Sequence, residues 1–275
     1  MVSSTKLNEL TPIVVVLGKG GVGKTTVARG LCELSAQAGT SAVRVELGRG
    51  SSIAGPDAGA VVLDEAKALD DAMTTVFGSR TIARGILGHS ALSRVARVVP
   101  GLRELALLVA ARALLGRYSR VVIDLPSTGH GLAWLTSSSV LERLVTQGPA
   151  WALAHEMSGA LRDPTATTFI TVTLPEPIVQ AETAELTARL AGDLGRTPVL
   201  AVMNQRRSLA PTFAADARAL AARSPAHAEQ VAQLERWAGS SLDAEGPGAT
   251  LDLPWWLLGP SPDAVAARLA TRVRA

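Results

Sequence analysis

The chain has 275 residues, nearly half of them apolar, which is enough to bury a large core. Its one cysteine, Cys32, excludes a disulfide framework and a metal cage built only from cysteines within one chain, and is typical of a reducing compartment. The formal net charge of +3 comes from scattered arginines, which is only a weak argument for nucleic acid and is better explained by a solvated surface. Abundant Ala, Val and Leu with few aromatic residues favour helices packed on a sheet.

Short apolar runs along the chain predict strands that are buried on both faces. These runs are 13–17, 42–46, 120–124, 168–173, 198–203 and 250–254. The segments with helical spacing are 24–38, 61–77, 101–115, 132–146, 178–194 and 211–237. Their alternation predicts an α/β fold: a doubly wound, mainly parallel sheet with helices on both faces and a site at the carboxyl ends of strands. We expect one domain over 1–275, with helical elaborations at about 77–117 and 131–162.

The two ends of the chain bear on where the protein works. Residues 1–11 lack the continuous apolar stretch of a secretory signal, so we expect a cytoplasmic protein. The last segment, 262–275, has helical spacing that places Val265, Leu269 and Val273 on one face and arginines on the rest. Such a helix either docks on its own domain or contacts a membrane surface, and its shortness and lack of Phe and Trp favour docking.

Residues 18–25, with the sequence GKGGVGKT, follow the first apolar run and predict a phosphate-binding P-loop. The pattern needs glycines where backbone N–H groups turn towards the phosphates, a lysine that reaches the same oxygens, and a hydroxyl for Mg²⁺. The helix that follows points its positive end at the phosphates. We therefore expect ATP and Mg²⁺ at this loop. The predicted nucleotide contacts are Gly18, Gly20, Gly21, Val22, Gly23, Lys24, Thr25 and Thr26.

A second buried strand is expected to end in the carboxylate that holds Mg²⁺ through water in P-loop proteins. Asp124 follows three apolar residues at the end of the run 120–124, which makes it the candidate. Thr25 and Asp124 are therefore the predicted metal ligands. The alternative is that Asp124 only caps the helix that follows.

Lys19 is an extra lysine that the general phosphate pattern does not require. It resembles the deviant P-loop of the dimeric ATPases that include the septum-placing, plasmid-partitioning, nitrogenase-iron and arsenite-pump groups. In those ATPases the added lysine reaches the partner's nucleotide across a face-to-face dimer. The resemblance thus implies a homodimer or heterodimer, with catalytic roles for Lys19 and Lys24; a plain surface lysine is the alternative.

Later segments are similar to the ArsA group, which contains the arsenite-pump ATPase and the targeting ATPase for tail-anchored membrane proteins. In chain order they are PGLRE at 100–104, DLPSTGH at 124–130, TLPE at 173–176 followed by Glu182 and Thr183, VMNQ at 202–205, and 253–259. Ser127 departs from the usual proline. The resemblance implies that Asn204 reads the adenine edge and that the loop from Pro254 covers the base, although Asn204 could simply cap a strand end.

The second predicted strand departs from this group at the residue that orients the attacking water. In the ArsA group this strand ends in Asp-Pro, and the position of that aspartate corresponds to Gly48 in this chain. Glu46, two residues earlier, lies on the same face of the strand, roughly 6–7 Å away along it. Phosphoryl transfer depends on positioning and charge stabilisation, so we expect ATP binding with weak or partner-dependent hydrolysis, which Gly48→Asp should accelerate. The alternative is that the register is shifted by two residues and Glu46 does the ordinary task.

The partner or client is less well specified. Because Cys32 is the single cysteine, the sequence predicts no arsenite site. It also predicts no zinc site, because no Cys-x-x-Cys clasp follows Asn204 and the histidines do not have the spacing of metal ligands. Apolar residues in 77–99 and 132–161 fit a core or dimer interface better than a client groove. Those named in the second segment are Trp134, Leu135, Leu141, Leu144 and Trp151.

The resemblance implies an ATPase that couples its nucleotide state to an unknown protein client or to peripheral membrane contact. One alternative is a catalytically silent regulatory subunit of a heterodimer, which would bind ATP tightly with little or no turnover. Another is a partition- or septum-type ATPase, which would bind DNA in a salt-dependent manner. The motif at 124–130 argues against that last alternative.

Overall fold

The computed structural model describes residues 10–47, 60–79, 81, 101–126, 131–206, 249–254 and 260–271, with 219, 222, 228, 229, 231 and 232. Several predicted features therefore lie outside the described residues. They are Gly48, the part of the switch-like motif at 127–130, most of the helix expected at 211–237, and the covering loop at 255–259.

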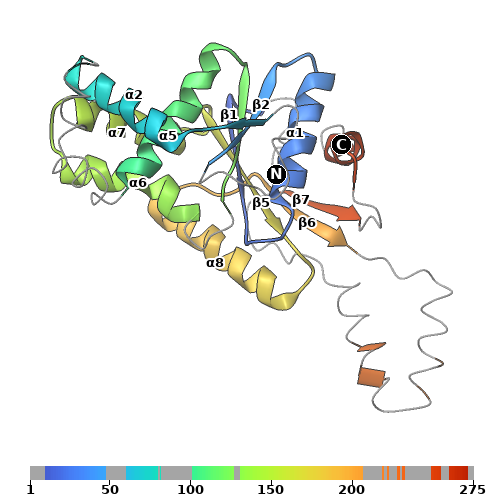
Figure 1. Cartoon of the computed structure of the whole chain (residues 1–275). Coiled ribbons are helices and arrows are strands. Elements are labelled where there is room, and N and C mark those ends of the chain that lie inside the picture. Colours follow the sequence, from blue (N-terminus) through green and yellow to red (C-terminus); the bar gives the residue numbers. More distant parts are fainter. Residues whose placement is uncertain are drawn as a thin grey trace.

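A parallel sheet forms the centre of the molecule (Figure 1). Within the described residues it has seven strands, in the order β3-β2-β4-β1-β5-β6-β7, and every pairing is parallel. The strands are β1 (Ile13–Leu17), β2 (Ala42–Glu46), β3 (Ala60–Val62), β4 (Arg120–Asp124), β5 (Thr167–Thr173), β6 (Leu200–Arg206) and β7 (Ala249–Pro254). The predicted doubly wound parallel sheet is confirmed.

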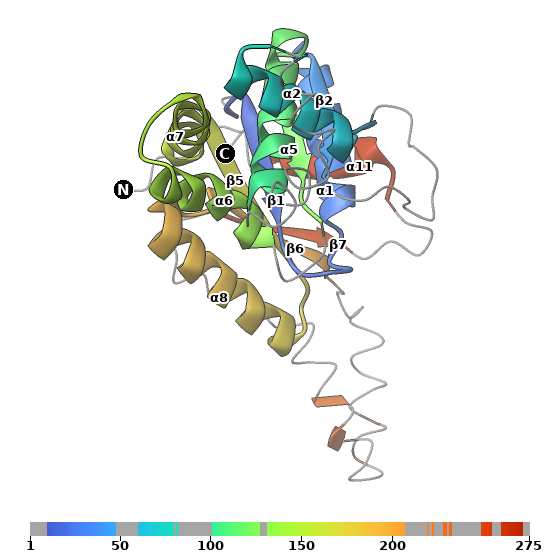
Figure 2. The same ribbon diagram turned by 60° about the vertical axis from the view of Figure 1, so that its left-hand side comes forward.

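Helices cover both faces of the sheet (Figures 1 and 2). The described helices are α1 (Lys24–Gln37), α2 (Glu65–Phe77), α5 (Leu102–Ala113) with the 3₁₀ turn η2 (Leu114–Gly116), α6 (Gly131–Leu144), α7 (Pro149–Arg162), α8 (Pro177–Leu194) and α11 (Pro262–Thr271). Side chains alternate along each strand, so Val15 joins the core under α2, α5, α6 and α7. Val14 and Val16 join the core under α1 and α11.

The expected helix 61–77 is wrong at its start. Residues 60–62 pair with β2 as β3, and α2 begins only at Glu65. Asp64 caps that helix, because its carboxylate accepts a hydrogen bond from the backbone N–H of Lys67 at 2.6 Å. Two apolar residues such as Val61 and Val62 fit the spacing of a helix as well as that of a strand. Only pairing with the neighbouring strand β2 makes them extended.

The helix expected at 132–146 ends at Leu144, and α7 follows it after Gly148. Leu135 and Leu141 of α6 are buried, as the core interpretation of this segment predicts. Leu144, at the end of the same helix, is 63% exposed.

The C-terminal helix α11 packs against α1. Its apolar residues Val265, Ala266 and Leu269 are buried, and Gly30 of α1 lies so close that a Cβ atom there would overlap the side chain of Val265. The docking interpretation of this helix is therefore confirmed for the described residues. In the described part of the chain, no helix combines the length and apolarity needed to cross a membrane.

Candidate nucleotide-binding site

The loop at 18–25 links the central strand β1 to α1 and depends on glycine at specific places. Gly18 has φ 151°, and a Cβ atom there would overlap the backbone carbonyl of Val172 on β5. Gly23 has φ 94°, and a Cβ atom there would overlap the amide of Asn204. Both positions therefore require glycine, for backbone conformation and for space. The loop is consequently packed tightly against Val172 of β5 and Asn204 of β6.

Lys24 is buried beneath this loop. Its Nζ donates hydrogen bonds to the carbonyl oxygens of Gly18 at 3.0 Å and Lys19 at 2.9 Å. Burial lowers the pKa of Lys24, while the charge of Asp124 opposes that shift. The ammonium group is thus fixed inside the loop, where an anion would relieve the cost of its burial.

The start of α1 is suited to an anion. The residue before the helix is Gly23, which has no side chain to occupy the first N–H groups, and the first turn contains no acidic residue. Unoccupied N–H groups and the positive end of the helix dipole both attract phosphate. The predicted phosphate contacts of the loop therefore surround one helix terminus.

Thr25 and Asp124, the predicted metal ligands, are brought together by strand pairing. Asp124 ends β4 beside Val16 of β1, and Thr25 Oγ1 donates a hydrogen bond to Asp124 Oδ2 at 2.6 Å. Burial raises the pKa of Asp124; the hydrogen bond from Thr25 and the charges of Arg44 and Lys24 oppose this shift. A hydroxyl and a carboxylate are oxygen donors that suit Mg²⁺. A bound Mg²⁺ would neutralise charge on the phosphates of the nucleotide.

Glu46 lies beside Asp124, because β2 and β4 are paired with these two residues in register. Its carboxylate forms an ion pair with Arg44 of the same strand. Arg44 Nη1 also donates to Asp124 Oδ2 at 3.3 Å, and the Arg44 side chain is only 3% exposed. Sequence reasoning missed Arg44, although a single cation in an apolar strand, two residues from a carboxylate on the same face, was a signal.

Asn204 reaches the loop from the carboxyl end of β6. Its Nδ2 donates a hydrogen bond to the carbonyl oxygen of Val22 at 2.9 Å, and the residue is buried. Pro254 ends β7 at the same edge of the sheet, in register with Arg206. The structure thus places Asn204 as a support of the P-loop, and its contact with adenine stays a prediction, as does that of Pro254.

Lys19 points away from the phosphate cradle. Its Nζ forms an ion pair with Glu182 of α8 at 2.7 Å, and both side chains are more than 40% exposed. Glu182 belongs to the segment that resembles the ArsA group. The side chain predicted to cross a dimer interface is thus exposed and paired within its own chain.

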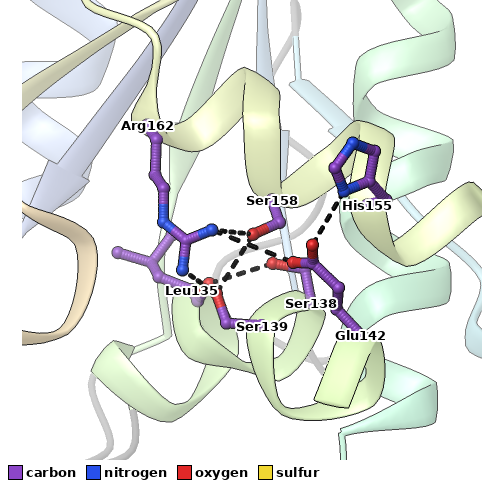
Figure 3. Close-up of polar contacts among 7 residues, drawn as sticks. All are labelled: Leu135, Ser138, Ser139, Glu142, His155, Ser158 and Arg162. Atoms are coloured by element: carbon purple, nitrogen blue, oxygen red, sulfur yellow. Dashed lines mark hydrogen bonds and ion pairs between the residues drawn. The ribbon is translucent and has the colours of Figure 1, made fainter. Parts of the chain in front are cut away.

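A polar cluster joins α6 to α7 (Figure 3). Arg162 donates to Ser158 Oγ at 2.7 Å and to Ser139 Oγ at 3.0 Å. His155 Nδ1 lies 2.7 Å from Glu142 Oε1, and the imidazole stacks on Trp151. The hydrogen bond with His155 is the main reason that the pKa of Glu142 is lowered. This cluster ties two helices of the elaboration together.

The remaining ligand-type side chains do not form a further metal centre within the described residues. The described residues contain no group of three or more His, Cys, Asp or Glu side chains placed to hold a metal ion. Cys32 lies on α1 partly packed against the core, and burial raises the pKa of its thiol to about 12, which keeps it protonated. The predicted lack of zinc and arsenite binding stays a prediction.

Comparison with known proteins places the site in a family. No curated protein sequence is similar enough to this chain to count as a match. The family model described as the CobQ/CobB/MinD/ParA nucleotide binding domain matches residues 13–214, which is well over half of the chain. That span includes β1, the P-loop, Asp124 and Asn204. The chain therefore belongs to the CobQ/CobB/MinD/ParA family of nucleotide-binding P-loop proteins.

Proposed function

We propose that this protein is an ArsA-like ATPase that binds ATP and Mg²⁺ at the P-loop and acts as a nucleotide-switched dimer. The observation that carries the proposal is the site at the start of α1. There, buried Lys24 lies inside a glycine loop, beside the hydrogen-bonded pair of Thr25 and Asp124. This combination supplies a cation for the phosphates and oxygen ligands for the metal.

Each residue has a role that follows from its position. Lys24 neutralises phosphate charge, because its Nζ is already held against the inner carbonyls of the loop. Thr25 and Asp124 hold Mg²⁺, and Glu46, beside Asp124, is the carboxylate nearest to the place of the missing switch aspartate. Glu46 is engaged by Arg44, which is consistent with slow hydrolysis by the isolated chain.

Exposure of Lys19 supports the dimer, whether homodimer or heterodimer. Lys19 and Glu182 are accessible on the surface next to the loop, so a partner could exchange with either member of the ion pair. An exposed ion pair contributes little, typically 1 kcal/mol or less, so its loss is easily offset by a dimer contact. The nucleotide state would then be coupled to a protein client or a membrane surface.

Binding and assembly test the proposal together. A slowly hydrolysed ATP analogue is titrated by calorimetry, and molar mass is measured with and without it. Lys24→Ala should weaken binding about tenfold or more, as expected for hydrogen bonds made by a charged group. Lys19→Ala should keep nucleotide binding and lose the ATP-dependent dimer.

The matched control is Lys67→Ala, which removes an exposed lysine that pairs with Asp71 on α2. It should change neither nucleotide affinity nor molar mass. Failure of the unmodified protein to bind ATP would overturn the proposed function. An ATP-bound monomer would overturn the dimer while leaving nucleotide binding intact.

A second candidate function is a catalytically silent regulatory subunit of a heterodimer. It is favoured by the pairing of Arg44 with Glu46, because a carboxylate held in an ion pair is less free to orient a water molecule. Turnover separates the two candidates: tight ATP binding without measurable phosphate release would favour the silent subunit, and steady release would favour the ATPase.

A further inference from the structure

Gln205 has a backbone conformation that residues other than glycine seldom adopt. Its φ is 56°, in the left-handed region, and among the described residues it is the one non-glycine residue with a positive φ. Such a conformation costs free energy, and residues that hold it gather at functional sites. The side chain of Gln205 is exposed, so its own burial does not account for the strain.

Gln205 lies in a β-bulge of β6. Met203 of β6 is in register with Asp252 of β7. The next pair is Arg206 with Pro254, so three steps along β6 match only two along β7. Arg206 lies on the same face of the sheet as Met203, because its Nη1 is 3.4 Å from Met203 Sδ. A strand without the extra residue would give Arg206 the same partner and the same face, so the bulge is not needed for strand pairing.

What the bulge adds is a bend directly after Asn204. A bulge bends its strand, increases the local twist and re-aims a neighbouring side chain. Asn204 Nδ2 donates a hydrogen bond to the carbonyl oxygen of Val22 at 2.9 Å. The fit is close, since a Cβ atom on Gly23 would lie 2.1 Å from the same Nδ2. A small shift of the amide would therefore either break the hydrogen bond or overlap the loop.

The bond from Asn204 fixes one peptide plane of the P-loop. The carbonyl group of Val22 and the N–H group of Gly23 belong to one planar trans peptide, so they point in opposite directions. Holding the carbonyl towards β6 therefore turns the Gly23 N–H away from β6. This N–H is one of the groups that the P-loop pattern directs at the phosphates. The aim of Asn204 thus controls one predicted phosphate contact.

We infer that Gln205 is a positioning residue: its left-handed backbone aims Asn204 at Val22 and thereby sets the phosphate-binding shape of the loop. The inference deepens the proposed function and rests on it, because it assumes that the loop binds a nucleoside triphosphate. Gln205 acts through its backbone, so replacements rank by how readily they adopt the left-handed conformation. Glycine and asparagine adopt it readily, whereas β-branched valine does not.

The test measures the affinity for a slowly hydrolysed ATP analogue by calorimetry. Gln205→Val should bind the analogue about fivefold more weakly, because valine lets the bulge relax and the nucleotide must restore it; this factor corresponds to about 1 kcal/mol. Gln205→Gly and Gln205→Asn keep the backbone conformation and should bind within about twofold of the unmodified protein. Ala249→Val is the matched control: it places valine at an exposed, extended position of β7 and should leave the affinity unchanged.

Two further variants separate positioning from a general loss of stability. If Gln205 acts through Asn204, Gln205→Val should weaken binding by less than about twofold when it is added to Asn204→Ala. Deletion of Gln205 removes the bulge and leaves Arg206 able to pair with Pro254. The deletion variant should remain folded in chemical denaturation and bind the analogue as weakly as Asn204→Ala does.

The outcomes distinguish the two claims. The positioning role is overturned, and the nucleotide site stands, if folded Gln205→Val or the folded deletion variant binds the analogue as tightly as the unmodified protein. It is also overturned if Gln205→Val weakens binding by the same factor with and without the Asn204 amide. If the unmodified protein binds no analogue, the proposed function fails and the positioning role fails with it.

Discussion

Replacing Asn204 by alanine tests how the P-loop is held in place. Asn204 Nδ2 donates to Val22 O at 2.9 Å in a buried setting, and Gly23 packs against the same amide. Removing the amide leaves a carbonyl oxygen of the loop without this donor. Loss of a buried hydrogen-bond partner costs about 1–3 kcal/mol, so we expect Asn204→Ala to lower the free energy of unfolding by that amount.

The same variant should weaken nucleotide binding, because the loop loses its support from β6. Chemical denaturation measures the free energy of unfolding, and calorimetry measures the affinities for ATP and GTP. If support of the loop is the whole role of Asn204, both affinities fall by the same factor. If the affinity for ATP falls by a larger factor than the affinity for GTP, Asn204 also contacts adenine, as the resemblance implies.

Glu185→Ala is the control, because Glu185 is an exposed residue in the regular helix α8. It should change the free energy of unfolding by less than about 0.5 kcal/mol, as expected for a surface substitution. The supporting role of Asn204 is refuted if Asn204→Ala is as stable as the unmodified protein and binds both nucleotides equally well.

Two further predictions concern packing and pH. Gly30→Ala should destabilise the protein by about 1–3 kcal/mol in thermal or chemical unfolding, because the new Cβ atom would overlap Val265. Gly192→Ala is the control: its Cβ atom would meet open space, so it should stabilise the protein by up to about 1 kcal/mol. Equal effects of the two substitutions would contradict the close contact of α1 and α11. Because the hydrogen bond with His155 lowers the pKa of Glu142 from its ordinary 4.5, that contribution to stability is complete above pH 4.5 and is lost as the pH falls through the folded-state value. Stability should therefore fall less steeply on acidification in Glu142→Gln, and parallel pH profiles would refute the linkage.

Much of the framework was predictable from local sequence. The mainly apolar runs of β1, β2 and β4 correspond to strands at the predicted residues, because strands buried on both faces are rich in apolar side chains. The helix after the P-loop begins at Lys24, as the motif requires. β3 was missed because three residues with no distinctive period become a strand only through pairing with β2.

The candidate site shows the same division. Thr25 and Asp124 were predicted as a pair because each belongs to a local pattern, and their contact confirms that they lie together. The ion pair of Arg44 with Asp124 joins residues 80 positions apart, and the bond from Asn204 to Val22 joins residues 182 apart. Neither belongs to a local pattern of spacing, so neither was predicted.

The sequence by itself determined the phosphate loop, the parallel α/β architecture and the family resemblance, because glycine positions and apolar periodicity act over a few residues. Only the tertiary structure decided what surrounds the loop. Strand order places β4 and β2 on one side of β1, which brings Arg44 and Glu46 to Asp124. It places β5 and β6 on the other side, which brings Asn204 to Val22. The polar contacts around the loop follow from that order, since they depend on which strands are neighbours.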